Sequence, residues 1–161
     1  TDVTMQDDIR SGTDAYSGTD YLVNATTIPE GDFLGYLDAP GDIMDTYGIE
    51  VQKGQILNIS VDPAGPMTID LRNSTGSVVG MYESAAGEPK EISWNSDGDG
   101  RVAIILIASN GHGTYSIKVH ISGEPTPDMP SYPTLTCVSG SGKIDLTWYA
   151  PSNDGGSPIL G

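Results

Sequence analysis

An apolar residue at every second position is the feature that most restricts what this chain can fold into. Segments 57–61 and 115–121 both show this alternation, with Leu57 and Tyr115 as their first apolar residues. Successive side chains of a β-strand point to opposite faces, so a period of two indicates a strand with one buried face. The run 102–108 is apolar at every position and indicates a central strand that is covered on both faces. These patterns predict an all-β fold.

The composition and the turn sequences support short strands rather than helices. The 161 residues include 21 glycines and 11 prolines, and Thr, Ser, Val and Ile are plentiful. This mixture suits strands that are joined by tight turns. Polar turns such as Asn73-Ser74-Thr75-Gly76 and Asn110-Gly111-His112-Gly113 separate the apolar runs. About eight strands without a long helix predict a β-sandwich or jelly roll over residues 21–122.

Changes in composition divide the chain into four parts. Residues 1–20 form an acidic, glycine-rich lead-in that cannot fold alone, and we expect it to pack on the sandwich of residues 21–122. Residues 123–132 are rich in proline, which denies hydrogen-bond donors to a sheet, and indicate a linker. Residues 133–161 contain one strand with a strongly apolar face, from Ile144 to Trp148. The segment is too short to bury that face, so we expect the natural protein to continue beyond Gly161.

The charge balance and the missing motifs disfavour several classes of function. The chain has 22 acidic and 7 basic residues, and its formal net charge is −15. Such a charge repels nucleic acid and anionic membranes, whereas it attracts cations and basic surfaces. No run approaches the roughly 18 apolar residues of a membrane span. Because neither His112 nor His120 has zinc-type spacing to another ligand and the sequence has no Gly-x-Ser-x-Gly elbow, we expect no enzymatic activity.

Two acidic clusters form the strongest candidate for a chemical site. They flank the first apolar run and contain Asp7, Asp8 and Asp14 upstream and Asp42 and Asp45 downstream. If the fold brings the clusters together, their carboxylates and nearby carbonyls, such as those of Ser11 or Gly12, make an oxygen shell that suits Ca²⁺. Carboxylates at close range also cost stability unless a cation offsets their repulsion. The alternative is a solvated acidic tail and a turn whose aspartates cap backbone amides.

Three Asn-x-Ser/Thr sequons are candidate sites of N-glycosylation and are compatible with an exported protein. They are Asn24-Ala25-Thr26, Asn58-Ile59-Ser60 and Asn73-Ser74-Thr75. The alternating strand pattern points Asn58 outward, where a glycan could be attached. Such triplets also arise by chance in a chain that is rich in serine and threonine, so use of each sequon stays open.

Other motifs have structural interpretations. Asp97-Gly98-Asp99-Gly100 resembles part of a calcium loop but lacks the distal glutamate, so we expect a hairpin turn. Cys137 is the one cysteine, and its apolar neighbours predict a small buried residue; the alternative is a reactive or intermolecular thiol. Exposed tyrosines could stack on sugar rings or on a collagen-like strand, although most are expected in the core or at its rim. The candidates for such stacking are Tyr16, Tyr21, Tyr36 and Tyr82.

The residues from about Gly31 to Ser122 resemble the bacterial and archaeal pre-peptidase C-terminal (PPC) domain. The resemblance rests on an ordered series of segments: Gly31-Asp32-Phe33-Leu34-Gly35-Tyr36-Leu37, Asp42-Ile43-Met44-Asp45-Thr46-Tyr47, Gly54-Gln55, Ile69-Asp70-Leu71 and Gly113-Thr114-Tyr115-Ser116-Ile117-Lys118-Val119. It implies a β-sandwich that is appended to secreted proteases and other surface proteins. Related collagen-binding domains of clostridial collagenases bind calcium between an acidic lead-in and an Asp-x-x-Asp pair. Asp42 and Asp45 match that pair, and residues 7–15 look like the lead-in.

Residues 131–161 resemble the start of a fibronectin type III domain. The matching segments are Pro133-Thr134-Leu135 for the first strand, Ile144-Asp145-Leu146-Thr147-Trp148 for the second and Pro151-Ser152-Asn153-Asp154-Gly155-Gly156-Ser157-Pro158-Ile159 for the following loop. The resemblance implies that a truncated fibronectin-like segment follows the sandwich and the linker, because only the first part of such a domain is covered.

Together these observations predict a non-catalytic accessory or adhesion module of a larger secreted or cell-surface protein, such as a protease or other hydrolase, stabilised by calcium. Two alternatives stay open. One is a module that specifically binds collagen-like protein or polysaccharide, and the other is a structural subunit whose C-terminal strands pair with another copy in a surface array or filament. We expect an extracellular or cell-surface location, with other domains of the parent protein as partners.

Overall fold

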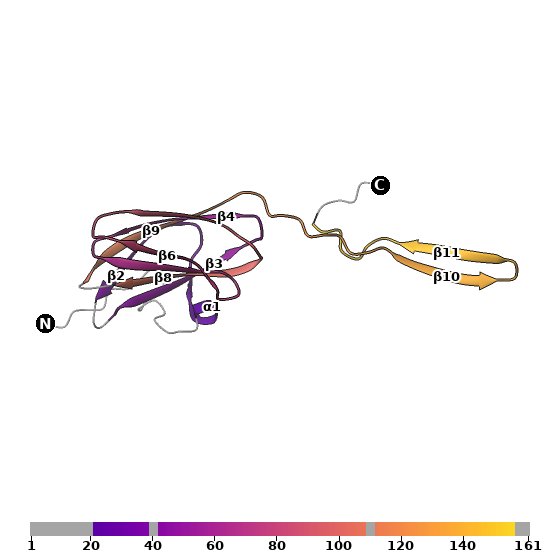
Figure 1. Ribbon diagram of the computed structural model, residues 1–161, viewed down its shortest axis with the longest axis horizontal. Coiled ribbons are helices and arrows are strands. Elements are labelled where there is room, and N and C mark those ends of the chain that lie inside the picture. Colours follow the sequence, from indigo (N-terminus) through magenta and orange to yellow (C-terminus); the bar gives the residue numbers. More distant parts are fainter. Residues whose placement is uncertain (1–20, 39–41, 109–111, 157–161) are drawn as a thin grey trace. The chain divides into compact units, whose positions relative to one another are not determined.

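The computed structural model describes residues 21–38, 42–108 and 112–156, and the chain divides into two compact units (Figure 1). The first unit comprises Thr1–Pro125 and the second comprises Thr126–Gly161. In the described part of each unit the structure is all-β apart from one short helix in the first, so the predicted all-β class is confirmed. Asp7, Asp8 and Asp14 lie outside the described residues.

One sheet of the first unit contains five strands. Their order is β1 (Thr26–Thr27), β3 (Met44–Val51), β8 (Gly100–Ala108), β5 (Met67–Arg72) and β6 (Val78–Ser84). The pair β1 and β3 is parallel, whereas the other neighbours are antiparallel. The short helix α1 (Tyr21–Asn24) lies against β3 and β8. The parallel two-residue strand β1 is too short to leave a periodic signal in the sequence.

The other sheet of the first unit contains four antiparallel strands. Their order is β2 (Gly31–Asp38), β9 (His112–Ser122), β4 (Ile56–Pro63) and β7 (Lys90–Asn95). The alternating segments 57–61 and 115–121 fall within β4 and β9, as predicted. In both strands every second residue is buried, starting with Leu57 in β4 and Tyr115 in β9. These buried residues face the five-stranded sheet.

The core lies between the two sheets, which makes the first unit a β-sandwich. It is built from apolar residues of both sheets, among them Ile49 and Ile104 from the first sheet and Leu57 and Ile117 from the second. Strand β8 is the third of five strands, and residues 102–106 are at most 1% exposed. The prediction that the run 102–108 is a central strand covered on both faces is therefore confirmed for residues 102–106, whereas Ile107 and Ala108 at its end are half-buried.

The second unit contains a two-stranded antiparallel hairpin. It consists of β10 (Thr134–Gly140) and β11 (Lys143–Tyr149), and every residue of both strands is exposed. Ile144, Leu146 and Trp148 lie on one face of β11, and Cys137 is the cross-strand partner of Leu146. The prediction that Cys137 is buried is wrong, because no described residue covers the face to which it belongs.

Candidate functional site

Asp42 and Asp45 lie where the chain enters β3. The amide of Ala108 donates to the carbonyl of Ile43 at 2.9 Å, which ties this entry to the end of the central strand β8. Asp42 is half-buried, whereas Asp45 is 0% exposed. Asp45 shares the core-facing side of β3 with Tyr47, because alternate residues of a strand point to the same face. The strand thus places a carboxylate inside the sandwich.

Two tyrosine hydroxyls meet this buried carboxylate. Tyr115, from β9 in the opposite sheet, donates its hydroxyl hydrogen to Asp45 Oδ2 at 2.5 Å. The Tyr115 hydroxyl also forms a hydrogen bond with the hydroxyl of Tyr47. Tyr47 and Tyr115 are 0% and 1% exposed. The three side chains, called the Asp–Tyr–Tyr cluster below, therefore join the two sheets by hydrogen bonds shielded from water.

The direction of these hydrogen bonds follows from the proton count. A phenol has one hydrogen, and that of Tyr115 is given to Asp45, so the bond between the two tyrosines must use the hydrogen of Tyr47. Hydrogen bonds in series polarise one another, and this series ends on the Asp45 carboxyl group. Burial, aided by Tyr47 and Asp45, raises the pKa of Tyr115 above its ordinary value. Tyr115 thus stays a donor at neutral pH.

Gly35 of β2 makes room for the Tyr115 ring. Gly35 and Tyr115 are cross-strand partners, and a Cβ atom at position 35 would lie 2.2 Å from the ring. No real Cβ atom approaches a ring carbon so closely, so a side chain here would push Tyr115 out of place. Gly35 therefore contributes to the position of the hydroxyl that binds Asp45.

Asp45 is one of the residues predicted from the sequence, whereas its partners Tyr47 and Tyr115 are not. Asp45, Tyr47, Ile49 and Val51 share one strand parity, so a carboxylate could have been expected at a core position. A buried carboxylate needs a hydrogen-bond donor. That requirement gave the kind of partner but not its identity, because Tyr115 is 70 residues away in sequence.

Two of the five predicted calcium ligands, Asp42 and Asp45, lie among the described residues. Asp42 and Asp45 supply carboxylate oxygens, which are the ligands that Ca²⁺ prefers. The burial of Asp45 and the hydroxyl it accepts hold one of these carboxylates in fixed geometry. Within residues 21–38, 42–108 and 112–156, no group of three or more His, Cys, Asp or Glu side chains could hold a metal. The other predicted ligands are outside these ranges.

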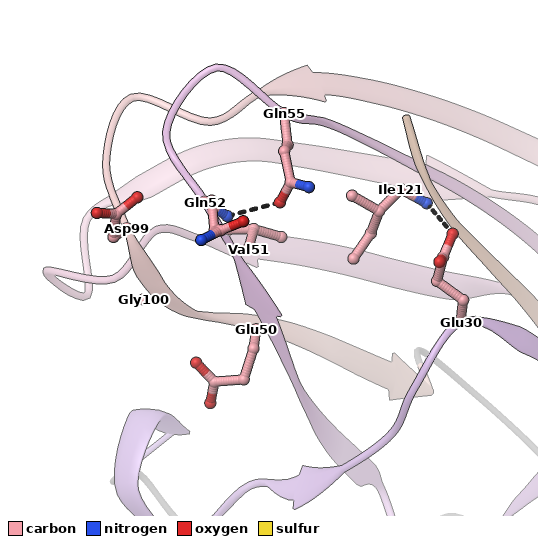
Figure 2. Close-up of a pocket in the computed structure, with 8 residues that line it drawn as sticks. All are labelled: Glu30, Glu50, Val51, Gln52, Gln55, Asp99, Gly100 and Ile121. Atoms are coloured by element: carbon pink, nitrogen blue, oxygen red, sulfur yellow. Dashed lines mark hydrogen bonds between the residues drawn. The ribbon is translucent and has the colours of Figure 1, made fainter. Parts of the chain in front are cut away.

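A hollow of about 600 Å³ lies at one end of the sandwich (Figure 2). Two of its acidic side chains accept hydrogen bonds from backbone amides: Glu30 accepts from the Ile121 amide at 2.5 Å, and Asp99 accepts from the Lys53 amide at 2.7 Å. Glu30 also pairs with Nδ1 of His120 at 2.9 Å. Asp99 belongs to the turn between β7 and β8. The prediction of a hairpin turn at residues 97–100 is wrong, because these two strands lie in different sheets and the turn carries the chain from one sheet to the other. The residues around the hollow are Glu30, Glu50, Val51, Gln52, Gln55, Asp99, Gly100 and Ile121.

A second hollow, of about 370 Å³, lies on the outer face of the four-stranded sheet. Asp32, Lys118, Ser60 and Glu91 are successive cross-strand partners and form one polar row across all four strands. Ser60 donates to Glu91 at 2.6 Å. The row therefore offers acceptors at both ends and an ammonium group between them.

The structure places the sequons and the tyrosines in different environments. Among the three candidate asparagines, Asn24 is exposed, Asn58 is half-buried and Asn73 is 8% exposed. Tyr36 and Tyr82 are half-buried, and Lys90 lies 5.6 Å from the centre of the Tyr82 ring. Tyr16 and the side chain of Tyr21 lie outside the described residues.

Comparison with known proteins shows a structural likeness. No family model matches the chain. The pre-peptidase C-terminal domain of a collagenase from Bacillus anthracis is 24% identical, with a TM-score of 0.52 over 59% of this chain and 93% of that domain. PliG from Aeromonas hydrophila, a periplasmic inhibitor of g-type lysozyme, is 13% identical, with a TM-score of 0.45 over 60% of this chain and 96% of that protein. The first likeness supports the sandwich architecture.

The described helix is short. Among the residues that the structure describes, no helix has the length and apolar character that a membrane span requires.

Proposed function

We propose that this chain is a non-catalytic accessory or adhesion module of a larger secreted or cell-surface protein, and that Ca²⁺ stabilises its sandwich. The observation that carries the cation proposal is the buried carboxylate of Asp45, held by Tyr115 and lying three residues from Asp42. A carboxylate costs free energy when it is taken from water. A cation bound at the entry to β3 would offset part of that cost.

Asp42 and Asp45 are the described residues that would hold the ion. We further propose Asp7, Asp8 and Asp14 as ligands, with carbonyl oxygens near Ser11 or Gly12 completing the six to eight oxygens that Ca²⁺ takes. When bound, the ion would supply positive charge and would tie the lead-in of residues 1–20 to the sandwich. The tyrosine hydroxyls would orient the Asp45 carboxylate and would not bind the ion themselves.

Two resemblances support the accessory role. The sequence segments that resemble a PPC domain fall in the sandwich, and the structure is similar to such a domain of a collagenase. Residues 131–161 resemble the start of a fibronectin type III domain, a module common in extracellular proteins. The net charge of −15 favours an environment with abundant cations and disfavours nucleic acid as a partner. A parent hydrolase and an extracellular location follow from these resemblances as part of the proposal.

Binding of a polysaccharide or a collagen-like polymer is a second candidate function. The polar row on the four-stranded sheet favours it, because hydroxyl-rich ligands need both donors and acceptors. Lys118 is exposed in the middle of this row. Glycan-array and collagen pull-down signals that disappear in Lys118→Ala would support this function. Binding that persists unchanged would show that the ligand does not bind at the polar row.

Thermal melting with and without Ca²⁺ tests the main proposal. At 100 times its dissociation constant, a ligand that binds only the folded state stabilises it by about 2.7 kcal/mol. We expect Ca²⁺ to raise the melting temperature above that in EGTA, and Asp42→Asn to remove most of the increase. Asp62→Asn is the matched control, because Asp62 is an exposed aspartate of β4. An equal melting temperature in Ca²⁺ and EGTA would contradict the cation proposal.

A further inference from the structure

We propose that Asn24 is an N-linked glycosylation site and that folding closes the other two sequons, at Asn58 and Asn73. In N-glycosylation, the amide nitrogen of asparagine bonds to C1 of a sugar carried on a polyisoprenyl phosphate or diphosphate. The bond from C1 to the phosphate oxygen breaks, the lipid phosphate leaves, and the amide loses one proton. The asparagine amide must therefore be free to enter a transferase and must still tolerate a large solvated group afterwards.

The side chain of Asn73 forms hydrogen bonds within the turn between β5 and β6. Its Oδ1 accepts from the Thr75 amide at 3.2 Å, from the Thr75 hydroxyl at 2.8 Å and from the Ser77 amide at 3.0 Å. Its Nδ2 lies 3.4 Å from Asp97 Oδ2, and the residue is only 8% exposed. Both the acceptor amide and the sequon hydroxyl are thus used inside the turn, so folding withdraws this sequon.

Asn58 is held on the surface of the four-stranded sheet. It lies in β4, which has β9 on one side and β7 on the other, so its backbone is paired in both directions. Its Nδ2 donates to the Ser122 hydroxyl at 3.1 Å, and its Oδ1 accepts from the Ser93 hydroxyl at 3.0 Å. A transferase would have to break both side-chain bonds and bend a paired strand to reach this amide.

The Asn24 side chain has the opposite environment, and Thr26 of its sequon belongs to the two-residue edge strand β1, which is paired on one side only. Asn24 is exposed, it is the last residue of α1, and its side chain forms no hydrogen bond with any other residue that the structure describes. The chain just after it is fixed, since Arg101 Nη2 donates to the Ala25 carbonyl and, at 2.6 Å, to the Thr27 hydroxyl. A glycan on Asn24 would leave these contacts in place, and it would project from the outer side of the sandwich.

The test compares the folded full chain with three synthetic peptides that span residues 18–30, 52–64 and 67–79. The folded chain and each peptide are incubated separately with a purified single-subunit oligosaccharyltransferase and its lipid-linked oligosaccharide. The fraction of each asparagine that carries a glycan is then measured by mass spectrometry of glycopeptides. In the folded chain, we expect Asn24 to be modified about as fast as its peptide, and Asn58 and Asn73 at least about tenfold more slowly than theirs. The variant Asn24→Gln should then lose nearly all glycan mass, whereas Asn58→Gln should keep it.

Two results would overturn the proposal. One is an Asn24 that stays unmodified in the folded chain while its peptide is modified. The other is modification of Asn58 or Asn73 in the folded chain at the rate of the corresponding peptide. Since each peptide reports the intrinsic reactivity of its sequon, a difference between chain and peptide isolates the effect of folding.

Discussion

Replacing Tyr115 with phenylalanine removes the hydroxyl at the centre of the Asp–Tyr–Tyr cluster while it keeps the ring. Asp45 Oδ2 then loses the hydroxyl that it accepts at 2.5 Å, and the Tyr47 hydroxyl loses its acceptor. Both groups are 0% exposed, so water cannot replace the lost partner without opening the core. The substitution thus isolates the hydrogen bonds that join the two sheets at Asp45.

The expected loss of stability is a sum of two contributions. A hydrogen bond to a charged group contributes about 1.5–3 kcal/mol, and a neutral bond contributes about 1 kcal/mol. Tyr115→Phe should therefore lower the free energy of unfolding by roughly 2.5–4 kcal/mol. For a unit of this size, the melting temperature should fall by roughly 10–20 °C.

Urea unfolding in EGTA, followed by tryptophan fluorescence, measures this loss without a cation contribution. Trp94 packs against the core and reports unfolding of the sandwich, whereas Trp148 is 67% exposed and should change little. Tyr82→Phe is the matched control, because Tyr82 is half-buried and its hydroxyl has no hydrogen-bond partner among the described residues. We expect it to change stability by less than about 0.5 kcal/mol.

A double mutant that carries Tyr115→Phe and Asp45→Asn separates the interaction energy of the two residues from the effect of each substitution alone. If Tyr115 acts through Asp45, the two changes should be non-additive by about 1–3 kcal/mol in a double-mutant cycle. A Tyr115→Phe protein as stable as Tyr82→Phe, or strictly additive effects with Asp45→Asn, would refute the hydrogen-bond argument.

Three further predictions follow from the same structure. Burial raises the pKa of Tyr115 above its ordinary value of 10.0, so the unfolded chain loses this proton first as the pH rises. The difference in unfolding free energy between the unchanged protein and Tyr115→Phe, measured by urea titration, should therefore be constant near neutral pH and should fall above about pH 10 by about 1.4 kcal/mol per pH unit. Gly35→Ala should cost roughly 2–4 kcal/mol in urea unfolding because its methyl group meets the Tyr115 ring, whereas Gly98→Ala, whose nearest neighbour is 3.9 Å away, should cost less than about 1 kcal/mol. Cys137 should react with a chromogenic disulfide in the native protein as fast as in urea because it is exposed, and a much slower native reaction would contradict the exposed hairpin face.

The strands could be predicted because their signal is local. In β4 and β9 the period of two gave both the location of the strand and the buried face, and the apolar run gave the central strand β8. A strand pattern reports only that one face is buried, not which strand covers it. The parallel pairing of β1 with β3 could therefore not be predicted from the sequence.

The candidate site was predicted only in part, for the same physical reason. Asp45 could be selected from a local acidic cluster, whereas its contacts with Tyr115 and Tyr47 depend on how the two sheets face each other. Cys137 shows the converse error: its apolar neighbours are typical of a buried strand, but burial also requires a second layer, which the described second unit does not contain.

Isothermal titration of Ca²⁺ into the full chain, after removal of bound metal with EGTA and dialysis, tests the proposed cation site most directly. We predict saturable binding that Asp42→Asn and Asp45→Asn each weaken by about tenfold or more, since Ca²⁺ affinity depends on the number of charged ligands. Asp62→Asn, which removes the same charge at an exposed position of β4, should bind as the unchanged protein does. No heat of binding, or equal affinity in all four proteins, would contradict a calcium site at the entry to β3.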